Sequence, residues 1–187
     1  MRSIGLFSLL LVLMMAACNR QPAQPPAPPA PEYNLDYPIE EIMEHIIMPT
    51  ADALWNSVQT NVTAKGIEEK APHTDDDWDK VRHLAVTMVE ATNLLIMPGR
   101  HVARPGAKPE DVSELTPEQI EARIKQDPAM WTMHVQTLHD VALQSVKAVD
   151  MKSADALMEA GDVLDKACEG CHLVYWYPPK PGEKPQQ

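Results

Sequence analysis

Apolar residues recur at steps of three and four along four stretches of this 187-residue chain. That spacing places them on one face of an α-helix, and no stretch reads as a strand. The pattern restricts the chain to helices that bury their apolar faces against one another. We therefore expect an all-α fold, an antiparallel four-helix bundle, over residues 36–177.

The first helix is expected to begin with Asp36 as N-cap and with Glu40 and Glu41 at the positive end of its dipole. Its apolar face comprises Ile39, Ile42, Met43, Ile46, Ile47, Leu54, Val58 and Val62. Pro49 interrupts this pattern and crowds the carbonyl of His45, so we expect a kink there.

The other helices have clear start signals. Residues 65–74 form an expected connection, and Thr74 then caps the second long helix, which Pro98-Gly99 ends. Capping signals at Thr116 and Asp127 predict a short helix to about Lys125 and the third long helix. Ser153 opens the fourth. The three inner faces are Trp78, Val81, Ala85, Met88, Thr92 and Leu95; Trp131, Val135, Leu138, Ala142, Val146 and Val149; and Leu157, Ala160, Leu164, Cys168, Cys171 and Tyr175.

The N-terminal segment has the pattern of an export signal. Arg2 precedes an apolar run from Ile4 to Met15 that is too short to span a membrane. The ending Met15-Ala16-Ala17-Cys18 resembles the lipobox of bacterial lipoproteins, which implies a signal peptide over residues 1–17 and a lipidated Cys18. The alternative is an ordinary signal peptide cut nearby. We favour the lipoprotein because a third cysteine in an oxidising compartment would otherwise be a free reactive thiol.

Residues 18–35 combine the lipid anchor with a segment rich in Pro, Ala and Gln, which predicts an extended tether. This segment, residues 19–31, would hold the domain roughly 40 Å from the lipid surface at about 3.1 Å per residue. Residues 178–187, which contain four prolines, are expected to form a flexible tail.

The five residues Cys168-Glu169-Gly170-Cys171-His172 form the attachment signature of a c-type haem. On a helix, positions i and i+3 share one face, so both thiols can bond to the two vinyl groups on one edge of the porphyrin. His172 then offers an imidazole nitrogen to the iron from the proximal side. Gly170 leaves room for the ring to approach. The predicted cofactor is therefore one covalent haem c.

Three other interpretations of the cysteine pair are possible. A zinc site requires further Cys or His ligands at recognisable spacing, and no cysteine remains in the domain. A thioredoxin-like redox pair requires a βαβ context, which the pattern lacks. A structural disulfide across so short a loop gives no reason for the adjacent His172.

The motif lies on the last of four helices, and in this the chain resembles the class II cytochromes c, the cytochrome c-prime family. The resemblance implies a bundle with haem wedged inside, and family members often form dimers through their first two helices, so a homodimer is expected here. The family divides by its sixth iron ligand. Some members leave the distal side open and bind NO or CO, whereas others place a first-helix methionine on the iron and carry electrons.

The first helix offers Met43 and Met48 for that role, and counting back one heptad from Trp55 selects Met48. The alternatives are that Met48 fills core space and that the iron stays five-coordinate. Family members commonly carry an Arg in the first helix, but no Lys or Arg occurs over residues 33–64. Lys166 and Arg100 are candidate partners for the haem propionates, or else solvated surface charges.

Two other histidines could approach a haem. His134 shares an inner face with Trp131, and His45 flanks the apolar stripe of the first helix. A hydrogen-bonded core histidine is the simpler interpretation of His134. Trp176 and Tyr177 are expected to cover the haem edge or the end of the bundle.

The function expected from these features is electron transfer by a membrane-tethered cytochrome facing the periplasm; the alternative is NO or CO binding at a five-coordinate haem. No acid–base pair, nucleophile or phosphate loop stands out, so we expect no enzyme activity. The net charge is −11, and removing the signal peptide deletes only Arg2 among the charged residues. This acidity argues against nucleic acid and favours a redox partner with a basic docking patch.

Overall fold

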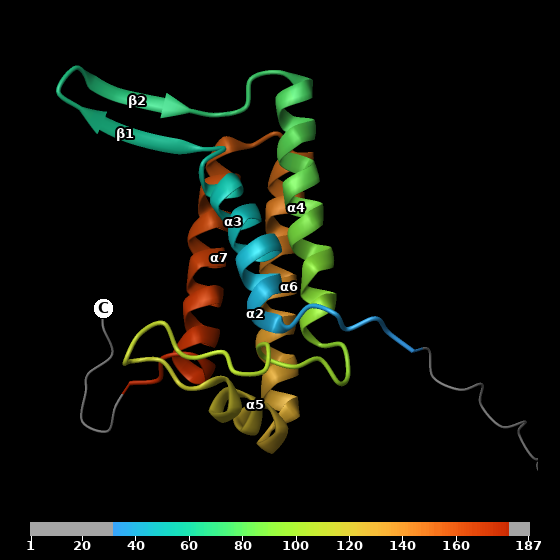
Figure 1. Ribbon diagram of the computed structural model, residues 1–187. Coiled ribbons are helices and arrows are strands. Elements are labelled where there is room, and N and C mark those ends of the chain that lie inside the picture. Colours follow the sequence, from blue (N-terminus) through green and yellow to red (C-terminus); the bar gives the residue numbers. More distant parts are fainter. Residues whose placement is uncertain (1–31, 180–187) are drawn as a thin grey trace, which may run out of the picture. The chain divides into compact units, whose positions relative to one another are not determined.

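The computed structural model describes residues 32–179. The chain divides into two units, Met1–Tyr33 and Asn34–Gln187, and every described element belongs to the second. In chain order these are α2 (Ile39–Ile42), η1 (Met43–Ile47), α3 (Met48–Trp55), β1 (Gln59–Thr63), β2 (Gly66–Lys70), α4 (Asp75–Leu95), α5 (Pro117–Gln126), α6 (Pro128–Asp150) and α7 (Ala154–Tyr175) (Figure 1). The predicted signal peptide, Cys18, most of the tether and residues 180–187 lie outside the described residues.

The first helical run begins at Ile39, so the predicted cap at Asp36 is wrong. Pro38 occupies the N-cap position and gives no side-chain hydrogen bond. The free amides are satisfied instead by a distant loop: Ile39 N–H donates to the His101 carbonyl at 3.0 Å and Glu40 N–H to the Val102 carbonyl at 2.9 Å. Tertiary contact thus replaces the local cap.

Pro49, where a kink was predicted, is preceded by a widened turn. The π-helical segment η1 lies between α2 and α3, and the Met48 N–H donates to the Met43 carbonyl five residues back. Proline cannot donate the usual hydrogen bond, and its ring crowds the preceding turn. The Thr50 hydroxyl donates to the Ile46 carbonyl at 2.5 Å, which supplies a donor for one carbonyl of that turn.

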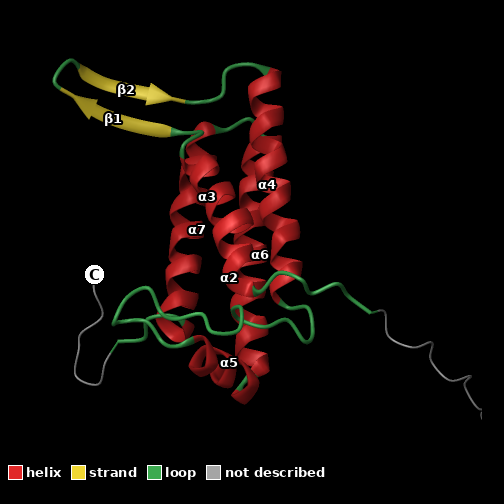
Figure 2. Cartoon of the chain, in the orientation of Figure 1, coloured by secondary structure: helices red, strands yellow, loops and turns green. Residues whose placement is uncertain are grey.

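The prediction of an all-α, antiparallel four-helix bundle is wrong, because residues 59–70 form a β-hairpin and α5 adds a further helix (Figure 2). Strands β1 and β2 pair antiparallel, with Val62 opposite Ile67. The first helix ends at Trp55, so the prediction that Val58 and Val62 belong to it is wrong. Thr60, Val62 and Thr63 are β-branched and suit a strand, and Gly66 has the φ of +128° that few side chains tolerate.

The remaining helices confirm the predicted starts. Thr74 caps α4 in a capping box with Asp77, and Thr116 caps α5 in a second box. The side chains of Asp127 and Ser153 cap α6 and α7. The predicted inner faces are buried except at Val146, Cys168 and Cys171, which are half-buried.

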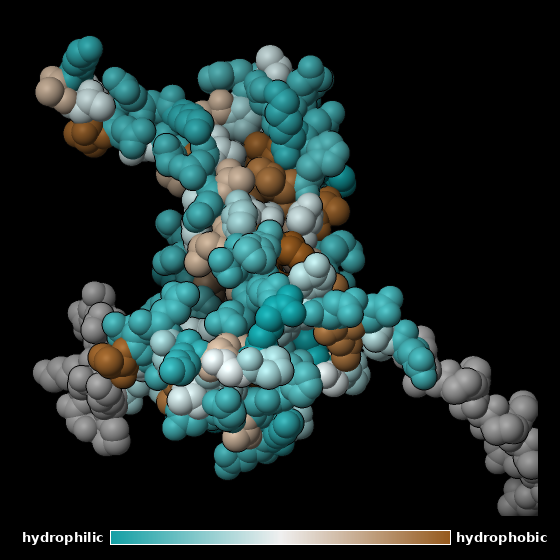
Figure 3. Space-filling model, viewed as in Figure 1, coloured by the Kyte–Doolittle hydropathy of each residue, from teal (hydrophilic) through white to brown (hydrophobic). Residues whose placement is uncertain are grey.

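One core joins the long helices. Helix α4 packs on α6, α6 packs on α7, and α3 contacts both α4 and α7. The most completely buried side chains include Met88, Val102, Ile120 and Leu164, each contributing about 1.5–3 kcal/mol by leaving water. The surface in Figure 3 is largely hydrophilic, although apolar surface also occurs on the hairpin, where Val62 is 84 % and Ile67 69 % exposed.

Candidate functional site

The predicted haem-binding residues lie together near the C-terminal end of α7. The helix is continuous from its Ser153 cap to Tyr175, so Cys168 and Cys171 are one turn apart on one face and His172 follows directly. Both cysteines are free thiols, and all three side chains are half-buried. Leu164, one turn earlier on the same face, is fully buried. The face therefore opens where the sulfur and imidazole groups begin.

Burial sets the protonation of these groups. Burial raises the pKa of Cys168 to about 11, assisted by Asp165, and that of Cys171 to about 12. Burial also lowers the pKa of His172. At neutral pH the site thus offers two neutral thiols and a neutral imidazole, which is the form of histidine that binds a metal.

The helix surface at Gly170 is uncrowded. A Cβ placed on Gly170 would meet nothing within 4 Å. By contrast, a Cβ on Gly161, in the first half of the same helix, would lie 3.1 Å from the Trp55 ring. Two free sulfurs one turn apart and an adjacent neutral imidazole match the donor set that a covalent haem requires.

An aromatic cluster adjoins the site on its α6 side. Tyr175 is buried, and its ring packs edge-on against Trp131 at 5.1 Å and against His134 at 5.8 Å between centroids. The Trp131 indole N–H donates to the Leu95 carbonyl at 3.1 Å. The half-buried His134 thus contacts the ring of Tyr175, the last residue of α7.

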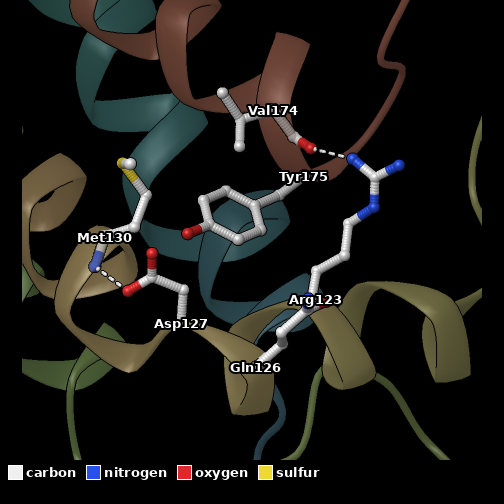
Figure 4. Close-up of a pocket in the computed structure, with 6 residues that line it drawn as sticks. All are labelled: Arg123, Gln126, Asp127, Met130, Val174 and Tyr175. Carbon is white, nitrogen blue, oxygen red and sulfur yellow. Dashed lines mark hydrogen bonds between the residues drawn. The ribbon is translucent and has the colours of Figure 1, made fainter.

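The last turn of α7 is held by residues from other elements. Leu115 N–H donates to the Trp176 carbonyl at 2.8 Å, and the Arg123 guanidinium of α5 donates to the Val174 carbonyl at 2.7 Å. Cationic donors at a helix C-terminus satisfy free carbonyls and oppose the dipole. An open pocket of about 450 Å³ lies beside this contact and is lined by Arg123, Gln126, Asp127, Met130, Val174 and Tyr175 (Figure 4).

A tyrosine and a glutamate stand next to His172. The Tyr177 hydroxyl donates to the Glu169 carboxylate at 2.6 Å and lies 3.4 Å from His172 Nδ1. Burial, followed by the Glu169 hydrogen bond, raises the pKa of Tyr177, so the phenol keeps its proton. Tyr177 was predicted to cover the haem edge or the end of the bundle, and its pairing with Glu169 beside His172 was not predicted. No spacing in the sequence signals the pair, because α7 ends at Tyr175 and Tyr177 reaches Glu169 only through the turn that follows.

Met48, selected as the sixth ligand, is 49 % exposed on α3. The buried face of that helix consists of Thr50, Ala51 and Leu54. Met43, in η1, is instead partly buried and packs against the core. The described structure thus brings Cys168, Cys171 and His172 together and leaves Met48 largely in solvent.

The two candidate partners of the haem propionates, Lys166 and Arg100, differ in burial. Lys166 is exposed on α7. Arg100 is half-buried in the loop after α4, where it donates to the Tyr37 carbonyl and, at 3.1 Å, to the Met97 sulfur. Its Nε is buried without a hydrogen-bond partner. His45, the other candidate iron ligand, is exposed beside Glu44.

Within residues 32–179, no helix is long and apolar enough to cross a bilayer, and no three His, Cys, Asp or Glu side chains converge to hold a metal ion. Comparison with protein-family models, curated proteins and solved structures finds no match for this chain.

Proposed function

We propose that this chain is a c-type cytochrome with one haem, bonded to Cys168 and Cys171 and ligated through iron by His172, and that it transfers electrons. The observation that supports the proposal best is the grouping of two free thiols and a neutral imidazole on one half-open face of α7. When bound, haem supplies an iron centre that cycles between the ferric and ferrous states.

The protein's own residues would serve that group in separate ways. The two sulfurs would fix the ring edge to α7, and His172 would supply a nitrogen ligand to the iron. Apolar and aromatic neighbours, including Tyr175 and Trp176, keep water from one side, and burial of this kind tunes the potential of a haem.

The proposal is tested by producing the full chain in a host that matures c-type haem. We expect a covalent mass increase of one haem and a Soret band, and both should be lost in the Cys168→Ala/Cys171→Ala variant. Met158→Ala, an exposed change on the same helix, serves as the matched control and should keep the haem. Colourless wild-type protein with the mass of the polypeptide alone contradicts the proposal.

A second function, binding of NO or CO at a five-coordinate iron, is favoured by the exposure of Met48. The visible spectrum of the reduced protein, recorded with and without CO, distinguishes the two functions. A low-spin spectrum that CO does not change indicates an electron carrier. A high-spin spectrum whose Soret band shifts with CO indicates an open distal site. Met43→Ala and Met48→Ala then identify any methionine ligand, because only replacement of the ligand changes the spectrum.

We further propose that lipidation of Cys18 tethers the protein on the periplasmic side of a bacterial membrane, and that its redox partner carries a basic patch. The lipobox-like ending and the net charge of −11 support these two points. Cys18→Ser should release the protein from membranes and remove the acyl mass. Electron transfer to a basic partner should slow as salt concentration rises, because salt screens the attraction between the proteins.

A further inference from the structure

The second nitrogen of His172 has a specific neighbour in the structure. Tyr177 Oη lies 3.4 Å from Nδ1, and the two rings are 5.7 Å apart between centroids with a tilt of 56°. On its other side the same oxygen is 2.6 Å from Glu169 Oε2. The three groups therefore form a chain: carboxylate, phenol, imidazole.

The direction of these hydrogen bonds follows from counting protons. A tyrosine hydroxyl has one proton to donate, and its oxygen can also accept. The short bond to an acidic oxygen takes that proton, because charge-assisted bonds are the stronger ones. Toward His172 the hydroxyl can then act only as an acceptor, so Nδ1 must carry the imidazole proton. Nε2 keeps its lone pair.

We propose that Tyr177 and Glu169 are positioning residues for His172, which hold its ring in the Nδ1–H tautomer so that Nε2 is the nitrogen presented to iron. This inference rests on the proposed haem function. Histidines that bind metals commonly donate their other ring N–H to a carboxylate or carbonyl, which fixes the ring and makes it a stronger donor. Here a phenol backed by a carboxylate takes that place.

The arrangement is built into the end of α7. Both the Trp176 and Tyr177 amides donate to the His172 carbonyl, at 2.7 and 3.0 Å, so the chain folds back over the histidine immediately after the helix. Glu169 precedes His172 by nearly one turn, and Tyr177 follows it. A single helix end therefore supplies the thioether sulfurs, the ligand and both positioning groups.

The first test reads the tautomer of His172 directly from the ¹⁵N shifts of its ring nitrogens in the full-length, haem-free chain at a fixed neutral pH. We expect mainly the Nδ1–H form in the wild type. Tyr177→Phe should change the tautomer ratio by roughly fivefold toward Nε2–H, the equivalent of one ordinary hydrogen bond. Glu169→Gln should shift it in the same direction by less. A wild-type Nε2–H form, or a ratio unchanged in Tyr177→Phe, overturns the inference.

The second test uses the haem-loaded protein. The Tyr177–Glu169 pair makes the imidazole a stronger electron-pair donor to iron. Tyr177→Phe should therefore weaken the iron–histidine bond, lower its Raman stretching frequency and raise the reduction potential. Tyr33→Phe and Glu159→Gln, which remove the same groups from exposed positions, are the matched controls. An unchanged frequency and potential, or shifts of opposite sign, contradict the inference.

The two proposals fail in distinguishable ways. A wild-type chain without covalent haem contradicts the proposed function, and the tautomer measured in the haem-free chain still decides the role of Tyr177. A haem-loaded chain whose Tyr177→Phe variant matches the wild type keeps the function and removes the positioning role.

Discussion

Helix α7 is packed differently in its two halves, although one periodic pattern runs through both. In the first half Leu157, Ala160 and Leu164 are 0–3 % exposed. In the second half Cys168 and Cys171 continue the same face and are half-buried. On the covered side of the first half, Gly161 also lies against Trp55, whose ring a Cβ at that position would approach to 3.1 Å. Sequence periodicity thus specifies which face is turned inward, and packing partners decide how much of it is covered.

The largest loss of stability should come from a substitution in the first half of α7, where the inner face is fully buried. Leu164→Ala should lower the free energy of unfolding of the haem-free chain by about 3 kcal/mol, since it opens a cavity in a fully buried position. Urea unfolding measures the loss. Met158→Ala, on the exposed side of the same helix, should cost far less. Equal losses of stability for the two variants would contradict the difference in packing between these positions.

The stability of the haem-free chain should depend on pH because of the two thiols on the half-open face. Each thiol has a folded pKa raised above the ordinary 9.0, so the folded state holds its proton more tightly. The resulting stability is present below about pH 9 and is lost as pH rises through about 11 and 12. Haem-free wild type should therefore lose stability more steeply above pH 9 than Cys168→Ala/Cys171→Ala, as followed by thermal unfolding. Parallel pH profiles would show that the thiols are solvated.

The two glycines of α7 are nine residues apart and so lie on opposite sides of the helix, one at a packed position and one at an open position. Gly170→Ala should stabilise the haem-free chain by about 0.5–1 kcal/mol, because alanine favours the helix and its Cβ meets nothing. Gly161→Ala gains the same propensity but pushes the Trp55 ring, whose indole N–H donates to the Gly161 carbonyl at 3.1 Å. It should show no net gain. Matched urea curves test both, and equal gains would mean that Trp55 moves freely.

The smallest change in the free energy of unfolding is expected in the hairpin, where few side chains are buried on either face. Val62→Thr and Ile67→Thr should each change the free energy of unfolding by less than about 0.5 kcal/mol, since both side chains are largely in solvent and threonine suits a strand. A large loss in urea unfolding would show that a partner covers the hairpin.

The parts of the fold that could be predicted depend on local chemistry. Thr74, Thr116, Asp127 and Ser153 each cap the helix that they were predicted to open, because a cap needs only its own first turn. The start of α2 could not be predicted from its neighbours, since its acceptors are the carbonyls of the loop at His101 and Val102.

The hairpin and the candidate ligands show a second limit. Val62 lies four residues after Val58 and so continues a helical period, although its β-branched neighbours favoured a strand. The heptad count to Met48 followed sequence spacing and reached a residue outside the buried face of α3. The positions of Cys168, Cys171 and His172 needed only a continuous helix. The approach of Tyr177 to His172 depends on the fold of the chain after that helix ends.

The cap of α2 has a consequence for the order of assembly. The amides at Ile39 and Glu40 find their acceptors only when residues 101 and 102 are in place. The first helix therefore leaves the ribosome before its own start can be completed, and it stays frayed until α4 and the following loop have formed. Amide exchange during refolding should report late protection at these two residues, after the amides in the middle of α4 are already closed.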